Sequence, residues 1–199
     1  MKLDLRLGET LQGDCTLKEL NLMLVFQVNC PGCLSKALPD LNAIASEYPQ
    51  INAFALSTAF EEFGLNNLHN TRLLLEQGDL TQASQRYFER LGYKKLPYKI
   101  SAPLVMDYFV QSEKLSELNS FVLAQLEGEL LPPKIERKFC DVIDQRLLPL
   151  ARTGRTFLNN ELQGTPSWFI FDKQLEVLDS WFGHKDAQWV RGVIERCLG

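Results

Sequence analysis

Apolar residues run almost without interruption from residue 22 to residue 28, which is the length of a strand. A run without polar alternation is typical of a central strand that is covered on both faces of its sheet. After Cys33 the apolar positions recur at helical spacing, at Leu34, Ala37, Leu38, Leu41, Ile44, Ala45 and Tyr48. The pattern therefore predicts a strand followed by an amphipathic helix, with a kink at Pro39.

A second apolar run, residues 51–57, follows directly after Pro49, which ends the helix. A strand, a helix and a strand of these lengths form a βαβ unit, so we expect two parallel strands joined by a right-handed crossover. Ahead of this unit, Leu3, Leu5 and Leu7 alternate with charged residues and predict a short edge strand.

The segment from Thr58 to about Leu162 has mostly helical spacing. The expected elements are helices at 67–77, 81–91, 115–126 and 132–147 and a short strand at 102–108. Gly78 and Gly92 are expected to end the first two helices, and Thr81 is expected to cap the second. The apolar stripe of that second helix is predicted at Leu80, Ala83, Tyr87 and Leu91.

The last part of the chain has the pattern of a second sheet unit. Two apolar runs, 168–171 and 175–181, flank a turn at 172–174, which predicts an antiparallel hairpin. A final amphipathic helix carries Trp189, Val190, Val193, Ile194 and Cys197. We therefore expect a single α/β domain over residues 1–199, with a mixed central sheet and a helical insertion at about 60–162.

Composition and charge limit the possible partners. The chain has 199 residues, of which 45% are hydrophobic and 23% charged, and a formal net charge of −4. These values are ordinary for a soluble globular protein, and the acidic balance argues against binding to nucleic acid or to an anionic membrane surface. Charges interrupt the first six residues, so no signal peptide is expected, and the location is expected to be cytoplasmic.

The candidate chemistry is the sequence Cys30-Pro31-Gly32-Cys33, which joins the central strand to the helix. The first N–H groups of a helix lack partners within the helix and carry partial positive charge. A thiolate there is stabilised, so the pKa of Cys30 is expected below the value of about 8.5 for a free cysteine. Pro31 suits the first helical turn. Our hypothesis is that Cys30 attacks a disulfide and that Cys33 resolves the mixed disulfide.

A closely spaced pair of cysteines can also be part of a metal site. A zinc site needs two further ligands, but the chain has no second Cys-x-x-Cys and no closely spaced Cys-His pair, so neither a metal nor another cofactor is expected. The remaining thiols, Cys15, Cys140 and Cys197, have no spacing typical of a disulfide framework and are expected to be core or surface thiols. His69 is expected to be an ordinary helix residue.

The order of these elements resembles the thioredoxin fold. The resemblance depends on Val25 to Cys33, on Gly164 to Phe171, and on the hairpin and the final helix, which together make up about half of the chain. The run from Ala55 to Phe63 and the long insertion are most similar to the TlpA-like redoxins. The resemblance implies a three-layer fold with a mixed sheet, in which the helical insertion lies between the second strand and the cis-proline strand.

The resemblance also implies roles for individual residues. Thr165-Pro166 matches the pair in which the proline is cis and the preceding residue binds the backbone of a substrate strand. Pro31 and Gly32 occupy the dipeptide that tunes the reduction potential. Two positions depart from thioredoxin, because its buried acid is replaced by Leu24 and the tryptophan before the motif by Asn29. No side chain is therefore assigned to proton transfer with Cys33.

The function implied is that of a thiol–disulfide oxidoreductase. It would reduce disulfides of proteins or small molecules and draw electrons from a redox donor protein. A thiol peroxidase is one alternative, but the Pro-x-x-x-Thr-x-x-Cys pattern of peroxiredoxins finds Met23 and Gln27, or Phe26 and Cys30, at its proline and threonine positions. A second alternative is a redox-sensing or binding module whose insertion recruits a partner.

Overall fold

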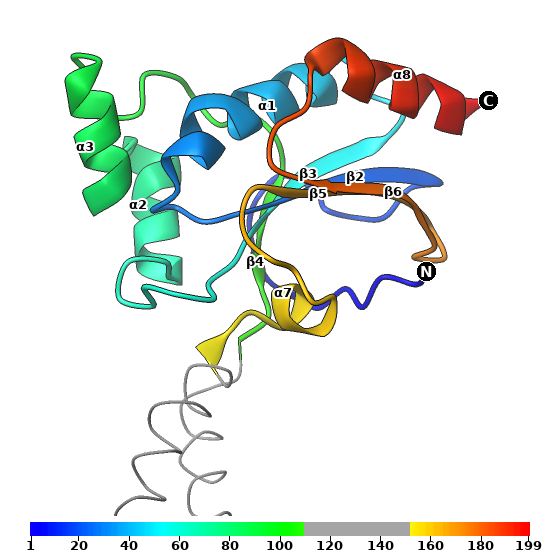
Figure 1. Ribbon diagram of the computed structural model, residues 1–199, viewed down its shortest axis with the longest axis horizontal. Coiled ribbons are helices and arrows are strands. Elements are labelled where there is room, and N and C mark those ends of the chain that lie inside the picture. Colours follow the sequence, from blue (N-terminus) through cyan, green and yellow to red (C-terminus); the bar gives the residue numbers. More distant parts are fainter. Residues whose placement is uncertain (110–151) are drawn as a thin grey trace, which may run out of the picture.

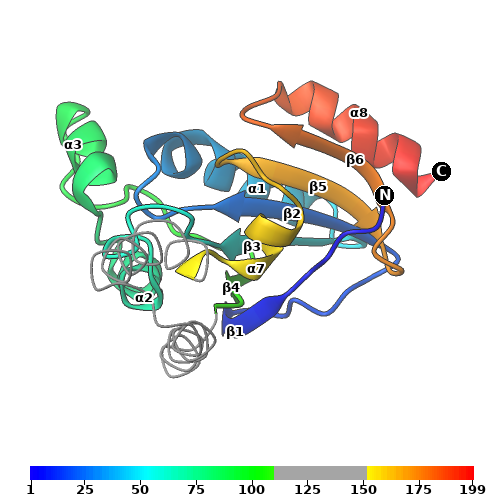
Figure 2. The ribbon, with the colours of Figure 1, turned by 60° about the horizontal axis from the view of Figure 1, so that its bottom comes forward.

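The computed structural model describes residues 1–109 and 152–199. Its described strands form one six-stranded sheet in the order β1-β4-β3-β2-β5-β6 (Figure 2). Their bounds are β1 Leu7–Gln12, β2 Leu20–Phe26, β3 Asn52–Ser57, β4 Leu104–Asp107, β5 Ser167–Asp172 and β6 Val177–Phe182. Strands β2, β3 and β4 are parallel, whereas β1, β5 and β6 pair antiparallel with their neighbours, so the sheet is mixed as predicted.

Helices cover both faces of this sheet. The described helices are η1 Cys33–Ala37, α1 Leu38–Glu47, α2 Leu68–Gln77, α3 Gln82–Arg90, α7 Arg155–Asn159 and α8 Ala187–Leu198. Figure 1 shows α1 and α8 on one face and α7 on the other, which makes three layers. None of the helices in residues 1–109 and 152–199 is long and apolar enough to cross a bilayer.

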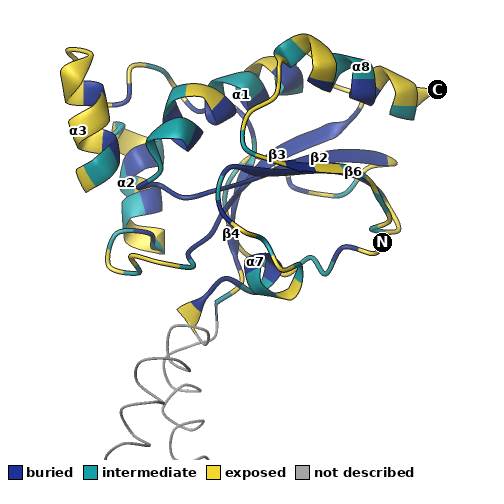
Figure 3. Ribbon diagram, viewed as in Figure 1, coloured by how far each residue is buried: buried dark blue, intermediate teal, exposed yellow. Residues whose placement is uncertain are grey.

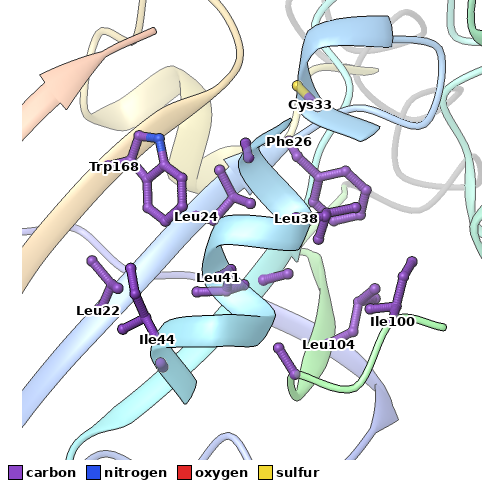
Figure 4. Packing of buried hydrophobic residues seen from close by; sticks show 14 of the residues in the cluster. Leu22, Leu24, Phe26, Cys33, Leu38, Leu41, Ile44, Ile100, Leu104 and Trp168 are labelled. Atoms are coloured by element: carbon purple, nitrogen blue, oxygen red, sulfur yellow. The ribbon is translucent and has the colours of Figure 1, made fainter. Parts of the chain in front are cut away.

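Strand β2 lies at the centre of the sheet, and every one of its residues is buried. It is parallel to β3 on one side and antiparallel to β5 on the other. Leu22, Leu24 and Phe26 pack in the core under α1, whereas Met23 and Val25 pack in the core on the opposite face. Figure 4 shows the first of these cores, with Cys33 at one end of it. The continuous apolar run therefore correctly indicated a central strand that is buried on both faces.

The helix after the dithiol is irregular where a kink was expected. Residues Cys33–Ala37 form a π-helical turn, in which the N–H of Leu38 donates to the carbonyl of Cys33. Pro39 follows in the first turn of α1. A proline within a helix lacks an N–H and its ring crowds the carbonyl four residues earlier, so the helix widens before it. The predicted apolar stripe of this helix is buried from Leu34 to Ile44, whereas its last two members, Ala45 and Tyr48, are partly buried.

The insertion adds a strand to the sheet. The short strand predicted at 102–108 is β4, which pairs parallel with β3 and antiparallel with the edge strand β1. The N-terminal edge strand begins later in the sequence than predicted. Strand β1 starts only at Leu7, and Leu3 is buried in the core on the α7 face. The helices predicted at 115–126 and 132–147, and Cys140 with them, lie outside the described residues.

Helix α3 turns a different face inward from the one predicted. Its buried residues are Ser84 and Phe88, whereas Tyr87 and Leu91 are 39% and 55% exposed (Figure 3). The hydroxyl of Ser84 donates to the carbonyl of Val28 at 2.9 Å, which holds that face against the end of β2. Thr81 is the N-cap residue as expected, but its hydroxyl makes no cap hydrogen bond.

Candidate active site

Cys30 and Cys33 form a disulfide at the C-terminal end of β2, with their Cα atoms 5.3 Å apart. Cys33 is fully buried, whereas Cys30 is only partly buried. The backbone N–H of Cys33 points at the sulfur of Cys30, with a nitrogen–sulfur distance of 3.2 Å. This N–H belongs to the first turn of the helix, so it is placed to stabilise negative charge on the outer sulfur.

A second loop lies against the outer sulfur. The Thr165-Pro166 peptide bond is cis, and the carbonyl oxygen of Thr165 lies 3.7 Å from Sγ of Cys30. The N–H of Gly183, just after β6, donates to the carbonyl of Pro166 at 2.8 Å and holds this loop in place. The structure thus brings the pair Cys30 and Cys33 together with the pair Thr165 and Pro166, although the two pairs are far apart in the sequence.

Two polar side chains that the sequence analysis did not assign support this loop and the dithiol. Gln27, which is 3% exposed, accepts a hydrogen bond at Oε1 from the hydroxyl of Thr165 at 3.2 Å. Its Nε2 is buried without a hydrogen-bond partner among the described residues. An amide in an otherwise apolar strand run was the available signal, because a buried amide needs partners.

Asn29 attaches the insertion to the dithiol. Its Oδ1 accepts hydrogen bonds from the Thr81 hydroxyl at 3.0 Å and from the N–H of Ala83 at 2.8 Å. Its Nδ2 donates to Glu62 at 2.6 Å, and its backbone N–H donates to the side chain of Asn66 at 3.0 Å. The residue that replaces thioredoxin's tryptophan therefore orients the start of α3 beside Cys30.

The core beneath the dithiol is apolar. Leu24, which replaces the acid of thioredoxin, is 0% exposed and packs among other buried hydrophobic side chains. The nearest strand therefore offers Cys33 no proton-exchanging side chain. Within residues 1–109 and 152–199, no group of three or more His, Cys, Asp or Glu side chains is placed to hold a metal ion.

A buried carboxyl lies two strands away at the same edge of the sheet. Asp107, at the end of β4, accepts hydrogen bonds from the Thr58 hydroxyl and from the N–H groups of Thr156 and Phe157. Burial raises the pKa of Asp107, and these hydrogen bonds oppose the rise. Its contacts join β3, β4 and α7, so its role in this structure is to hold these elements together.

Solved structures of similar shape were found over the whole length of the chain. A thiol-disulfide isomerase from Corynebacterium glutamicum matches with a TM-score of 0.61 at 16% identity, covering 100% of this chain and 96% of that one. A thioredoxin-like superfamily protein matches with a TM-score of 0.55 at 16% identity, covering 100% and 97%. The chain has a thioredoxin-like fold. Its sequence matches no protein-family model. No curated protein matches it either.

The thioredoxin-like fold explains why the predicted site residues meet. Its central strand delivers Cys30 and Cys33 to one edge of the sheet, and the loop before β5 brings Thr165 and Pro166 to the same edge. Pro31 and Gly32 complete the turn between the two cysteines and are partly exposed. Of the two histidines, His69 lies exposed on α2, whereas His184 lies against the backbone of Gly32.

Proposed function

We propose that this protein is a thiol–disulfide oxidoreductase in which Cys30 is the nucleophile and Cys33 the resolving thiol. The observation that supports this most strongly is the unequal exposure of the two sulfurs of one redox pair. Cys30 is partly exposed and faces a helix N–H, whereas Cys33 is 0% exposed. An incoming disulfide can therefore reach the first sulfur and not the second.

The reaction proceeds in two exchanges that conserve electrons. In the reduced protein the Cys30 thiolate attacks one sulfur of the target disulfide and releases the other target sulfur as a thiolate. The Cys33 thiolate then attacks Cys30, which releases the second target thiol and forms the Cys30–Cys33 disulfide. The target gains two electrons and the protein loses two, so an external dithiol donor protein must return the protein to its reduced state.

The target is proposed to be a disulfide in an extended protein segment or in a small molecule. The backbone of Thr165 lies beside the outer sulfur, with its carbonyl oxygen 3.7 Å away. An extended peptide that pairs with this backbone would be held without a requirement for particular side chains. We place the protein with the TlpA-like redoxins, and in the expected cytoplasmic location reduction of the target is the favoured direction.

The experiment that tests this function uses the two single cysteine variants. Cys33→Ser should trap mixed disulfides with target proteins through Cys30, because the resolving thiol is missing. Cys30→Ser should trap none, because Cys33 is buried. Non-reducing electrophoresis of the purified variants with a disulfide-bearing protein substrate shows the complexes. A wild-type protein without turnover in a disulfide-reduction assay, or variants that both retain wild-type turnover, would exclude the proposed function.

A further inference from the structure

The turn between β6 and α8 passes directly over the dithiol turn. Gly183 has a φ of +80°, a conformation that favours glycine, and its N–H is bonded to the carbonyl of Pro166. His184 follows it. A Cβ built on Gly32 would lie 3.1 Å from Nε2 of His184, which is tighter than an ordinary contact. The imidazole therefore lies against the backbone between Cys30 and Cys33.

The surroundings of His184 are partly polar. His184, Asp40, Trp168 and Trp181 line a cavity of about 10 Å³, close to the smallest volume that holds one water molecule. The indole N–H groups of Trp168 and Trp181 are buried and have no hydrogen-bond partner among the described residues. His184 therefore borders a small pocket that is lined by two buried indole rings and by the carboxylate of Asp40.

Two charged side chains, those of Asp40 and Lys185, line the same pocket as His184, and further charged groups lie nearby in the chain. Asp40 of α1 lines the cavity and is paired with Lys36 at 3.0 Å. Lys185 follows in the same turn, with its ammonium 5.4 Å from the ring centre of Trp189. Asp186 caps α8 by accepting the N–H of Gln188 at 2.8 Å. Glu62 is engaged by the side chain of Asn29, the residue before Cys30. His184 is itself exposed to solvent.

We propose that His184 is a positioning residue that couples reduction of the Cys30–Cys33 disulfide to proton uptake. The imidazolium would stabilise the Cys30 thiolate from across Gly32, adding to the effect of the helix N-terminus. Histidine changes its charge between pH 5 and 8, so the coupling acts near neutral pH. This inference deepens the proposed oxidoreductase function and rests on it.

The step balances with a dithiol as the reductant. The donor's two thiols form a disulfide and give up two electrons and two protons, and the Cys30–Cys33 bond breaks. One proton goes to Cys33 as a thiol and the other to the imidazole of His184, which leaves Cys30 as a thiolate beside an imidazolium. Because thiolate and imidazolium each stabilise the other, the coupling is reciprocal.

The test compares reduction potentials of the full chain in glutathione redox buffers at pH 6 and pH 9. Acid quenching, alkylation and peptide mapping report the Cys30–Cys33 pair apart from the other thiols. For His184→Gln we expect the equilibrium constant for reduction to fall about tenfold at pH 6, or about 30 mV for a two-electron couple, with no change at pH 9. His184→Lys should have the reduction potential of the wild type at pH 6 and a higher reduction potential than the wild type at pH 9. His69→Gln is the matched control and should change neither value.

The inference is overturned if His184→Gln leaves the potential unchanged at pH 6, or lowers it equally at both pH values. These potentials need no protein substrate, so they separate the two proposals. If the protein turns over but His184→Gln shows no pH-dependent shift in reduction potential, only the role of His184 is overturned. If that shift is present but there is no turnover and no trapped complex, only the oxidoreductase function is overturned.

Discussion

At the scale of single residues, the environment of each thiol sets its chemistry. Cys30 lies at a helix N-terminus and is partly exposed, whereas Cys15 is 8% exposed and lies in the loop between β1 and β2. Burial, together with the negative charge of Asp14, raises the pKa of Cys15 to about 11. Burial also raises the pKa of Cys197 on α8. Both thiols were expected to be ordinary core or surface residues, and their surroundings agree with that.

The thiols should therefore differ in alkylation rate. At pH 8 we expect Cys15 to react with iodoacetamide roughly a hundredfold more slowly than a free cysteine, because so little of it is thiolate. In the reduced protein Cys30 should react first. Peptide mapping after timed labelling measures both rates, with the urea-unfolded protein as the control in which Cys15 reacts normally. Labelling of Cys15 at the rate of a free cysteine in the folded protein would contradict the prediction.

At the scale of elements, buried polar contacts decide how the insertion meets the sheet. The side chain of Asn29 holds the start of α3 beside Cys30, and the hydroxyl of Tyr98 donates to the carbonyl of Leu34 in the dithiol helix. Burial raises the pKa of Tyr98, so its hydroxyl stays protonated as a donor. Both sides of the dithiol turn are thus tied to segments of the insertion.

Asp107 gives a pH-dependent test of such contacts. Because the pKa of Asp107 is raised above its ordinary value of 3.8, the carboxyl stabilises the folded state most below pH 3.8, and this contribution falls as the pH rises toward the folded-state pKa. Asp107→Asn should lower the free energy of unfolding by about 1–3 kcal/mol through lost hydrogen bonds. That deficit should shrink as the pH rises, by at most about 1.4 kcal/mol per pH unit.

Urea unfolding of wild type and variant at pH 3.5, 5 and 7 measures this difference. Asp4→Asn is the control of opposite sign, because the Arg6 side chain bonded to Asp4 lowers the pKa of that carboxyl. The lowering of the free energy of unfolding by Asp4→Asn should therefore vanish as the pH falls and grow as the pH rises. If the difference in free energy of unfolding between the wild type and Asp107→Asn grew with rising pH, the Asp107 carboxyl would be stabilised as an anion and the prediction would be wrong.

Sequence patterns identified the elements better than they identified the faces of the helices. The strands β2 and β3, the hairpin β5–β6 and the helix α1 follow from apolar runs and spacing. The central strands are buried on both faces, which gives continuous apolar runs, and α1 is buried along one stripe, which gives helical spacing. The inward face of α3 could not be read in this way. Ser84 is buried there by a hydrogen bond to Val28, and a polar residue held by a distant carbonyl leaves no apolar signal.

At the scale of the whole molecule, two hydrophobic cores stabilise the sheet from opposite faces. The core under α1 and α8 contains Leu24 and Phe26 and reaches Cys33, whereas the core on the α7 face contains Phe54 and Phe171. The rings of Phe54 and Phe171 meet edge to face at 6.5 Å. The second core lies away from the dithiol, so it is the place to change stability without touching the redox site.

Phe54→Ala should lower the free energy of unfolding by about 3–5 kcal/mol, because a fully buried ring leaves a cavity. Leu178→Ala on β6, where the side chain is 49% exposed, is the matched control and should change it by about 0.5 kcal/mol or less. Urea unfolding of the oxidised proteins measures both. Similar losses for the two variants would mean that the α7-face core does not stabilise the fold in the way that its burial indicates.

The sequence by itself determined the central strand, the dithiol at the start of a helix and the returning hairpin. Each of these depends on short-range periodicity or on neighbouring residues, as in Cys30 to Cys33. Only the tertiary structure decided what surrounds the dithiol: the Thr165 carbonyl beside Cys30, the contact of Gln27 with Thr165, and the ring of His184 over Gly32. These groups come from separate loops and strands, and only the packing of the sheet brings them to one edge.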